Sequence, residues 1–372
     1  MNIPFLDLKR QYQPIKEEID EAIQGVVDSQ NFILGSEVKN FEENLAKYCG
    51  AKHAIGVASG TDALLLSLKA HGVSGDVITS PFTFFATAGA IYNAGANPQF
   101  ADIDPDTFNL DPEDLERKVK ENDKITAIIP VHLYGQPADM KPIMEIAEDH
   151  DLTIIEDAAQ SIGAKYNGKN IGSMNTTCFS FFPAKNLGCY GDGGIITTND
   201  DEIAENIHTL RVHGSKPKYY HHVIGFNSRL DSIQAAILSV KLKYIDKWND
   251  IRISNAKLYN KYLKDVEGLQ VPKINSQNKH VFNQYTLRIS NGLRNDLQKF
   301  MTKKNINTAI YYPLPLHLQP CFSYLDYGKC SFSNAELISQ EVLSFPVYPE
   351  MKREEIEYIC TNLLKFFEKV VS

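Results

Sequence analysis

Short apolar segments alternate with helical patterns between residues 53 and 214. The apolar segments have the length of strands and include "HAIGVAS", "DVITSP", "ITAIIPVHLYG" and "LTIIEDAAQ". The segments between them include "GTDALLLSLKAHG" and "KPIMEIAEDH", which are typical of helices. This alternation predicts an α/β fold with a mainly parallel, doubly wound sheet that helices cover on both faces. Because ligands bind such sheets beyond the carboxyl ends of the strands, we expect the functional residues in the loops that follow the strands.

The pattern changes after residue 230. Residues 230–266 predict a long helical stretch, and shorter strands and helices follow it to the C-terminus. A chain of 372 residues is long enough for one large and one smaller domain. We therefore predict a large domain over residues 1–240, which begins with a helical segment and carries the ligand-binding loops, and a small C-terminal α/β domain over residues 241–372.

The composition and the sequence pattern argue against binding to nucleic acid, insertion into a membrane, secretion and a metal site. The formal net charge is −8, and no basic stripe predicts binding to nucleic acid or to an anionic membrane. No apolar run approaches the roughly 20 residues that span a bilayer, and the N-terminus lacks the pattern of a signal peptide. The six cysteines are scattered, as is typical of reduced thiols in a cytoplasmic protein. His213, His221 and His222 lack the spacing of metal ligands, so we expect no metal and interpret them as surface or interface residues.

A turn at Ser59, Gly60 and Thr61 joins a predicted strand to a predicted helix in "VASGTDALLLSL". The free amides and the positive dipole end of that helix suit a phosphate group. A simple helix capped by a hydroxyl side chain is the alternative, and the segment taken alone favours it. The segment is not a Walker loop, because it lacks the lysine of that motif.

Two carboxylates end the apolar strand in "IIEDAAQS", Glu156 and Asp157, and Gln160 follows three residues after the second. A carboxylate buried there is unfavourable unless a cationic group pairs with it. Asp157 could hold the protonated ring nitrogen of a pyridine cofactor. A helix N-cap at Asp157 is an equally good interpretation of the segment by itself.

A single lysine, Lys185, follows the strand and precedes a glycine-rich run in "FSFFPAKNLGCYGDGG". An amine that is partly removed from water has a lowered pKa and becomes a usable nucleophile. A solvated surface lysine is the alternative. A dinucleotide fingerprint is excluded, because the glycines lack the G-x-G-x-x-G spacing and precede a strand instead of opening a helix. Together, the three loops predict an anion cradle, a pyridinium partner and an amine, which are the parts that pyridoxal phosphate needs.

Motifs along nearly the whole chain resemble the DegT/DnrJ/EryC1/StrS family of pyridoxal-phosphate-dependent sugar aminotransferases. They include "FILGSEVKNFE", "SGTDAL", "PFTFFATAGAI", "EDAAQSIGA", "FSFFPAKNLGCYGDGG", "GFNSRLDSIQAAIL" and "YYPLPLHLQP". The resemblance implies the aminotransferase fold type I, with the cofactor in the large domain. It also implies a homodimer with shared active sites.

The resemblance assigns roles to individual residues. Lys185 would bind the cofactor covalently and later move the proton. The implied cofactor-binding residues are Gly60, Thr61, Phe84, Asp157, Gln160, Ser180 and Asn227, the last reaching the phosphate in the neighbouring subunit. The implied substrate-binding residues are Arg229, Tyr311, Tyr312 and His317. Arg229 bracing the dimer and His317 capping a loop remain as alternatives.

The implied reaction transfers an amino group from glutamate to a keto-sugar nucleotide, in amino-sugar biosynthesis for a surface polysaccharide, such as a lipopolysaccharide O-antigen, or for a glycosylated metabolite. The motifs most resemble relatives that aminate C3 of a UDP- or dTDP-linked sugar, and amination at C4 is the alternative. Relatives that act on 3-keto-hexuronates tend to have histidine where Tyr311 stands, which argues against a carboxylated sugar. Lys185 argues against the dehydratase branch, which has histidine there. A cofactor-binding regulator without turnover is the alternative from another class.

Overall fold

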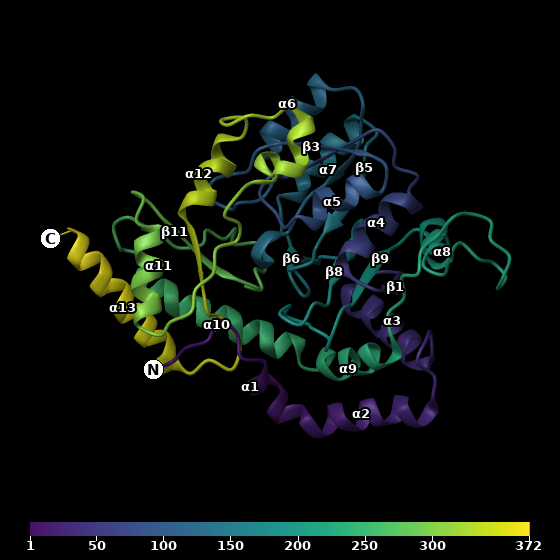
Figure 1. Ribbon diagram of the computed structural model, residues 1–372, viewed down its shortest axis with the longest axis horizontal. Helices are drawn as coiled ribbons and strands as arrows, with labels where there is room; N and C mark the ends of the chain where they lie inside the picture. Colours follow the sequence, from purple (N-terminus) through teal and green to yellow (C-terminus); the bar gives the residue numbers. More distant parts are fainter. Residues whose placement is uncertain (372) are drawn as a thin grey trace.

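The computed structural model describes residues 1–371, with side chains as far as residue 369, and Figure 1 shows the course of the chain. A seven-stranded sheet forms its centre, in the order β1-β9-β8-β5-β4-β2-β3. The strands are β1 (His53–Val57), β2 (Asp76–Thr79), β3 (Asn97–Phe100), β4 (Ile125–Ile129), β5 (Thr153–Asp157), β8 (Thr176–Ser180) and β9 (Gly194–Thr198). Only β9 runs antiparallel to its two neighbours in this sheet. The predicted mainly parallel α/β sheet is therefore confirmed.

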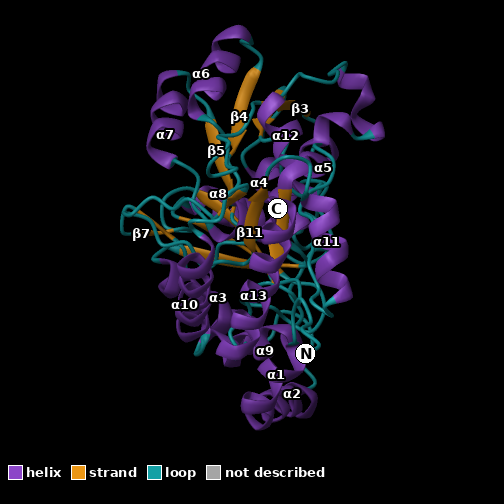
Figure 2. Cartoon of the chain, turned by 90° about the vertical axis from the view of Figure 1, so that its left-hand side faces the viewer, coloured by secondary structure: helices purple, strands orange, loops and turns teal. Residues whose placement is uncertain are grey.

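Helices cover both faces of the sheet. Successive side chains of each strand point to opposite faces, so each strand contributes to a core on either side. In β9, for example, Ile195 packs into one core and Ile196 into the other. The second of these cores contains residues of α4 (Gly60–Ala70), α5 (Ala86–Asn93) and α8 (Asp201–Leu210). The first contains residues of α2 (Lys16–Ser29), α3 (Ser36–Cys49), α6 (Pro112–Glu121), α7 (Met140–Asp149) and α9 (Ser232–Leu242). Figure 2 shows β4 and β5 between α6 and α7 on one side and α5 on the other.

A second, smaller sheet lies in the C-terminal part of the chain. Its three antiparallel strands are β10 (Leu269–Gln270), β11 (Tyr285–Ile289) and β12 (Val342–Phe345). The helices of this part are α10 (Ile245–Leu263), α11 (Arg294–Lys303), α12 (Ser333–Glu341) and α13 (Arg353–Val371). The hairpin of β6 (Lys165–Tyr166) and β7 (Lys169–Asn170) stands apart from both sheets.

The predicted long helical stretch over residues 230–266 is interrupted. It forms α9 and α10, with Lys243 and Tyr244 between them. Residues of α9 pack with the large sheet, whereas Ala256 and Tyr259 of α10 belong to the core of the small sheet. The domain boundary near residue 240 stays a prediction.

The start of the chain lies against the C-terminal part, and helix α1 (Leu8–Tyr12) follows it. The Ile3 amide donates to the Asn305 carbonyl at 2.8 Å, and the Asn307 amide donates to the Ile3 carbonyl at 3.0 Å. The ring of Phe5 lies 6.0 Å from that of Tyr311. The first residues are therefore fixed by partners about 300 positions away in the sequence.

Candidate active site

A cavity of about 550 Å³ lies where β1, β5 and β8 end. The loops after these strands meet there, as expected for an open α/β sheet. The predicted site residues that line this cavity are Gly60, Thr61, Phe84, Asp157, Gln160, Ser180, Lys185, Tyr311 and Tyr312. Residues separated by up to 252 positions, from Gly60 to Tyr312, are thus brought to one place by the fold.

The N-terminus of α4 forms one end of the cavity. The Ser59 hydroxyl accepts a hydrogen bond from the Asp62 amide at 3.1 Å, so Ser59 does cap the helix. The Ala63 amide donates to the Ser59 carbonyl, which leaves the amides of Gly60 and Thr61 for a bound anion. The capped-helix interpretation and the anion cradle are therefore compatible.

Glycine allows three strand ends to meet closely at this cradle. A Cβ atom on Gly60 would lie 2.6 Å from the Ser180 Cβ atom. A Cβ atom on Gly194 would lie 2.4 Å from the carbonyl carbon of Ser59. Since Gly194 pairs with both Val57 and Ser180, the antiparallel strand β9 draws β1 and β8 together at the cradle.

Asp157 lies at the carboxyl end of β5 and is almost fully buried. Its Oδ1 atom accepts from the Ala159 amide at 3.1 Å, and its Oδ2 atom accepts from the Thr87 hydroxyl at 2.8 Å. Burial raises the pKa of Asp157, while these hydrogen bonds and the nearby Lys185 oppose the rise. Turns follow Asp157 instead of a helix, so the helix N-cap interpretation is wrong.

A buried hydrogen bond between a histidine and a glutamate was missed beside this carboxylate. The neighbouring Glu156 points away from Asp157, as the alternation of a strand requires, and its Oε2 atom lies 2.7 Å from His132 Nε2. Because His132 Nδ1 accepts from the Ala138 amide at 3.0 Å, the Nε2 atom carries the hydrogen and donates to Glu156. His132 also lines the cavity. The only signal in the sequence is its place directly after an apolar strand, in "VHLYG".

Lys185 lies on a tight turn after β8, and its side chain lines the cavity. Its amide donates to the Phe182 carbonyl at 2.8 Å. Burial lowers the pKa of the Lys185 amine to about 8, and the negative charge of Asp157 partly opposes this shift. At pH 7 about one tenth of an amine with this pKa is neutral, far more than for an ordinary lysine. The side chain is half-buried and lines the cavity, so the interpretation as a solvated surface lysine is wrong.

The aromatic residues Phe84 and Tyr312, from two distant parts of the chain, also line the cavity. Phe84 is 59% exposed although it is apolar, and its ring lies 6.2 Å from the ring of Tyr312. Gln160 accepts from the Tyr134 amide at 2.6 Å through Oε1 and donates to the Tyr312 hydroxyl at 3.3 Å through Nε2. An aromatic face that is open to a cavity suits a planar ring stacked on it.

Three predicted site residues lie outside this cavity lining. His317 is buried, its Nε2 atom lies 3.1 Å from Glu336, and its ring packs against Phe332. The chain by itself therefore does not place His317 in the pocket, which agrees with the alternative that it fixes a loop. Asn227 is exposed and Arg229 half-buried, in the segment before α9. Their roles in a neighbouring subunit stay predictions.

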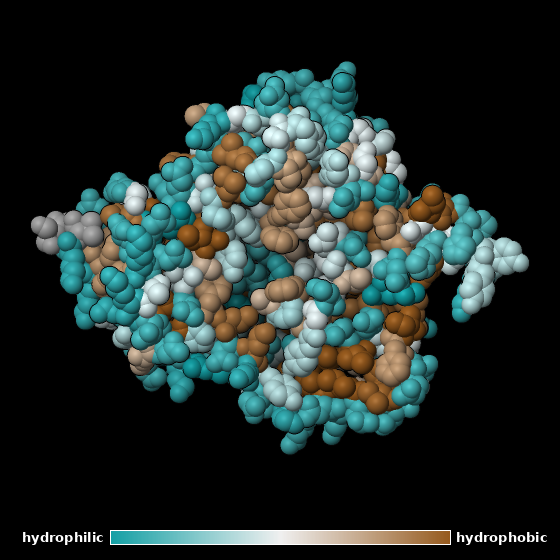
Figure 3. Space-filling model, in the orientation of Figure 1, coloured by the Kyte–Doolittle hydropathy of each residue, from teal (hydrophilic) through white to brown (hydrophobic). Residues whose placement is uncertain are grey.

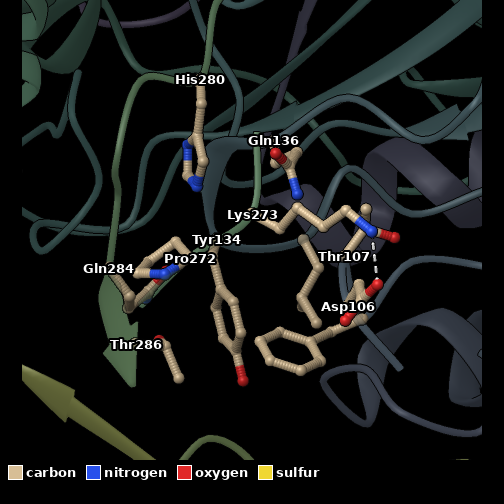
Figure 4. Close-up of a pocket in the computed structure, with 11 residues that line it drawn as sticks. Asp106, Thr107, Tyr134, Gln136, Pro272, Lys273, His280, Gln284 and Thr286 are labelled. Atoms are coloured by element: carbon tan, nitrogen blue, oxygen red, sulfur yellow. Dashed lines mark hydrogen bonds and ion pairs between the residues drawn. The ribbon is translucent and has the colours of Figure 1, made fainter. Parts of the chain in front are cut away.

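A second, much smaller cavity of about 10 Å³ lies near β11, and Figure 4 shows the residues around it. Lys273 and Asp106 form an ion pair of 2.5 Å at its edge. Within the described part of the chain, no group bonds to the buried Oε1 atoms of Gln136 and Gln284, which belong to the lining. The volume is at the lower limit for one water molecule. This cavity is thus too small for a substrate.

The chemistry of the large cavity fits pyridoxal phosphate. It has amides and a hydroxyl for a phosphate at one end, a buried carboxylate for a ring nitrogen, an open aromatic face and a lysine of lowered pKa. Within residues 1–371, no group of three or more metal-ligating side chains was found, and no helix is long and apolar enough to cross a membrane.

Known proteins resemble this chain over almost its whole length. The model of the DegT/DnrJ/EryC1/StrS aminotransferase family matches residues 13–364. A "Pleiotropic regulatory protein" of Geobacillus stearothermophilus is 52% identical, with 99% of each chain covered. The UDP-2-acetamido-2-deoxy-3-oxo-D-glucuronate aminotransferase of Pseudomonas aeruginosa is 44% identical, with 97% of this chain and 99% of that protein covered.

A solved structure gives the same result for the fold. The crystal structure of S. venezuelae DesV in complex with a ketimine intermediate superposes with a TM-score of 0.96 at 38% identity, with 99% of each chain covered. The match confirms the predicted aminotransferase fold. The chain therefore belongs to the DegT/DnrJ/EryC1/StrS family of pyridoxal-phosphate-dependent sugar aminotransferases.

Proposed function

We propose that this enzyme transfers an amino group from glutamate to position 3 of a keto-sugar linked to UDP or dTDP. The observation that carries the proposal is that Lys185 and Asp157 line one cavity together with the anion cradle at Gly60 and Thr61, and that their charges influence each other. The name of the P. aeruginosa relative, with a 3-oxo sugar, supports position 3. Position 4 is the alternative.

Bound pyridoxal phosphate supplies an electron sink for the carbon that loses its proton. In our proposal the amides of Gly60 and Thr61 and the Ser180 hydroxyl hold the phosphate. Asp157 holds the proton of the ring nitrogen, and Phe84 stacks on the ring with Gln160 near the ring hydroxyl.

Lys185 provides both covalent attachment and proton transfer in this proposal. Its Nζ atom would take a proton from the reacting carbon of the donor and pass it to the cofactor, and in the second half of the reaction it would move a proton in the opposite direction, to the carbon of the sugar. A general base works best when its pKa is near the working pH, and burial lowers the pKa of Lys185 to about 8. The site therefore favours the neutral amine that the transfer needs.

The substrate would enter beside Tyr311 and Tyr312, which line the cavity. Tyr311 stands where we expect histidine in enzymes for 3-keto-hexuronates. We therefore favour a sugar without a carboxylate, although the P. aeruginosa relative is named for a glucuronate.

We also propose that the enzyme is a cytoplasmic homodimer whose subunits share their sites through Asn227 and Arg229. Exposed apolar residues support a buried partner surface nearby: Val27, Phe32, Ile33 and Leu34. The Ser232 amide donates to the Phe32 carbonyl at 3.0 Å, so this surface adjoins the segment of Asn227 and Arg229. Figure 3 shows apolar side chains gathered at the level of α2 and α9. The product would serve a surface polysaccharide, such as a lipopolysaccharide O-antigen, or a glycosylated metabolite.

The test is the absorption spectrum of the purified enzyme with pyridoxal phosphate, recorded before and after glutamate is added. We expect glutamate to convert the band of the lysine-bound cofactor to that of the aminated cofactor. Keto-sugar nucleotides are then screened by which one restores the first band. NMR of the product distinguishes amination at C3 from C4.

Two outcomes would contradict the proposal. A simple keto acid that restores the band as fast as any sugar nucleotide would remove the sugar assignment. A bound cofactor that responds to no amino donor would favour the cofactor-binding regulator, an alternative consistent with the name of the G. stearothermophilus relative.

A further inference from the structure

Two buried threonine hydroxyls form a chain that ends on Asp157. The Thr83 and Thr87 hydroxyl oxygens lie 3.1 Å apart, and the Thr87 hydroxyl lies 2.8 Å from Asp157 Oδ2. Thr87 is fully buried and Thr83 nearly so. Thr87 is the second residue of α5, a helix far from β5 in the sequence. The contact is therefore made by the fold and not by local structure.

The direction of the hydrogen bonds follows from the chemistry of the groups. An ionised carboxylate can only accept, and a threonine hydroxyl has one hydrogen to donate. The Phe84 carbonyl is a second acceptor for Thr87, at 3.2 Å, but the carboxylate is closer and charged. Thr87 thus donates to Asp157, and Thr83 donates to Thr87. Each donor in the chain strengthens the next bond.

The anionic form of Asp157 needs such support. Burial raises the pKa of this carboxyl, and the hydrogen bonds from Ala159 and Thr87 oppose the rise. The other titratable groups that interact with Asp157 are Lys185, His132, Tyr312, Cys178. Lys185 and His132 also favour the anion. However, neutralising Lys185 to make it a base removes its contribution.

We propose that Thr87 is a positioning residue that holds Asp157 as an oriented anion facing the ring nitrogen of the cofactor. The same turn of chain carries the stacking residue, because the Thr87 amide donates to the Phe84 carbonyl at 3.2 Å. Thr87 therefore links Asp157, which would face the ring nitrogen, to Phe84, which would stack on the ring. This inference rests on the role proposed above for Asp157.

The test compares Thr87→Val with Thr87→Ser in the holoenzyme. Valine keeps the shape and loses the hydroxyl, whereas serine keeps the hydroxyl. Thr79→Val is the matched control, because Thr79 is equally buried and donates at 2.7 Å to the Ile129 carbonyl instead of to Asp157. The readouts are the dissociation constant of pyridoxal phosphate and the ¹⁵N chemical shift of its ring nitrogen as a function of pH.

We expect Thr87→Val to weaken cofactor binding about tenfold, the effect of one hydrogen bond to a charged group. The ring nitrogen should lose its proton at lower pH than in the wild type, and Thr87→Ser should restore both values. Wild-type values in Thr87→Val would overturn the inference. Equal defects in the serine and valine variants would also overturn it, because packing and not the hydroxyl would then be responsible.

An Asp157→Asn variant separates this inference from the proposed function. If the ring nitrogen keeps its proton in Asp157→Asn, the role of Asp157 itself is wrong and the inference falls with it. If Asp157→Asn loses the proton and Thr87→Val does not, only the role of Thr87 is wrong.

Discussion

Two lysines, the half-buried Lys185 and the buried Lys241, interact with different groups, and desolvation lowers the pKa of each to about 8. Lys185 faces the cavity and interacts with Asp157. Lys241, on α9, instead donates to the Gly188 carbonyl at 2.5 Å and lies 4.3 Å from the centre of the Tyr190 ring. A lowered pKa therefore does not identify a catalytic lysine. The two differ in what their amines face.

The partners of Lys241 explain its place in the fold. The Gly188 carbonyl that it binds lies three residues after Lys185, in a loop too tight for any side chain at Gly188, where a Cβ atom would lie 2.5 Å from the Pro183 carbonyl oxygen. The amine of Lys241 thus holds the loop that contains Gly188. The amine of Lys185 makes no such contact and faces the cavity.

The largest effect expected from this comparison is catalytic. Lys185→Ala should lower the rate of transamination about 10⁴-fold or more, because it removes both the attachment and the proton transfer. Lys241→Met should lower the same rate by less than about tenfold. Turnover is measured with glutamate and the sugar nucleotide found by the spectral screen. Comparable losses in the two variants would mean that the lysines do not differ in role.

The next effect concerns stability, and here we expect the larger loss in the Lys241 variant and not in the Lys185 variant. Lys241→Met leaves the buried Gly188 carbonyl without its donor, which typically costs about 1–3 kcal/mol. Lys185→Met removes a poorly solvated amine that makes no such bond in the described structure, and should stabilise the apoenzyme slightly. Thermal unfolding of the apoenzymes checks both signs. A lower melting temperature for Lys185→Met than for Lys241→Met would contradict the comparison.

The pH dependence of stability should be alike for both lysines. Each amine has a pKa of about 8 in the folded chain and an ordinary value of 10.5, so between these pH values the unfolded chain holds more protons. The free energy of unfolding contributed by each lysine therefore rises with pH across this window. Urea unfolding of wild type and Lys185→Met at pH 7.5 and pH 10 should show the wild type gaining on the variant. A constant difference would mean that the pKa of Lys185 is not lowered.

The smallest effect distinguishes the charges beside each amine. Asp157 raises the pKa of Lys185, and Glu350 raises that of Lys241. Asp157→Asn should lower the pKa of Lys185 in the apoenzyme, by less than about one unit, and leave that of Lys241 unchanged. Glu350→Gln should do the reverse. Competitive labelling of the amines against pH, read by mass spectrometry of peptides, measures both values.

The parts of the site that a single strand end supplies could be predicted from the sequence. Asp157 ends β5 and Lys185 lies on the loop after β8, so the α/β pattern alone places them at one edge of the sheet. The interaction of Thr87 with Asp157 could not, because 70 positions separate them and a threonine at a helix start has many ordinary roles. Lys241 was hidden for a similar reason. In the sequence it is one lysine in a helix, and only packing shows that it is buried.

The helix break and the direction of β9 are two features of the fold that the sequence pattern alone does not predict. Residues 230–266 have an unbroken helical pattern, and the break at Lys243 and Tyr244 comes before the chain passes to the core of the small sheet, since Ile245 and Trp248 of α10 still belong to the core of the large sheet. The pattern of β9 fits a parallel strand equally well, and only its pairing with β1 and β8 shows the antiparallel direction. Tertiary packing decides both features.

The attachment of the first residues to the C-terminal part has a consequence for how the chain is made. Ile3 pairs with Ile306, 303 positions later in the sequence, so this pairing cannot form until residue 306 has been synthesised. Pairings of such high sequence separation close late in folding. The contact of Phe5 with Tyr311, which lines the cavity, can form only then as well. A nascent chain stalled before residue 306 would thus carry Gly60, Thr61 and Lys185 but not Tyr311 and Tyr312, which line the same cavity.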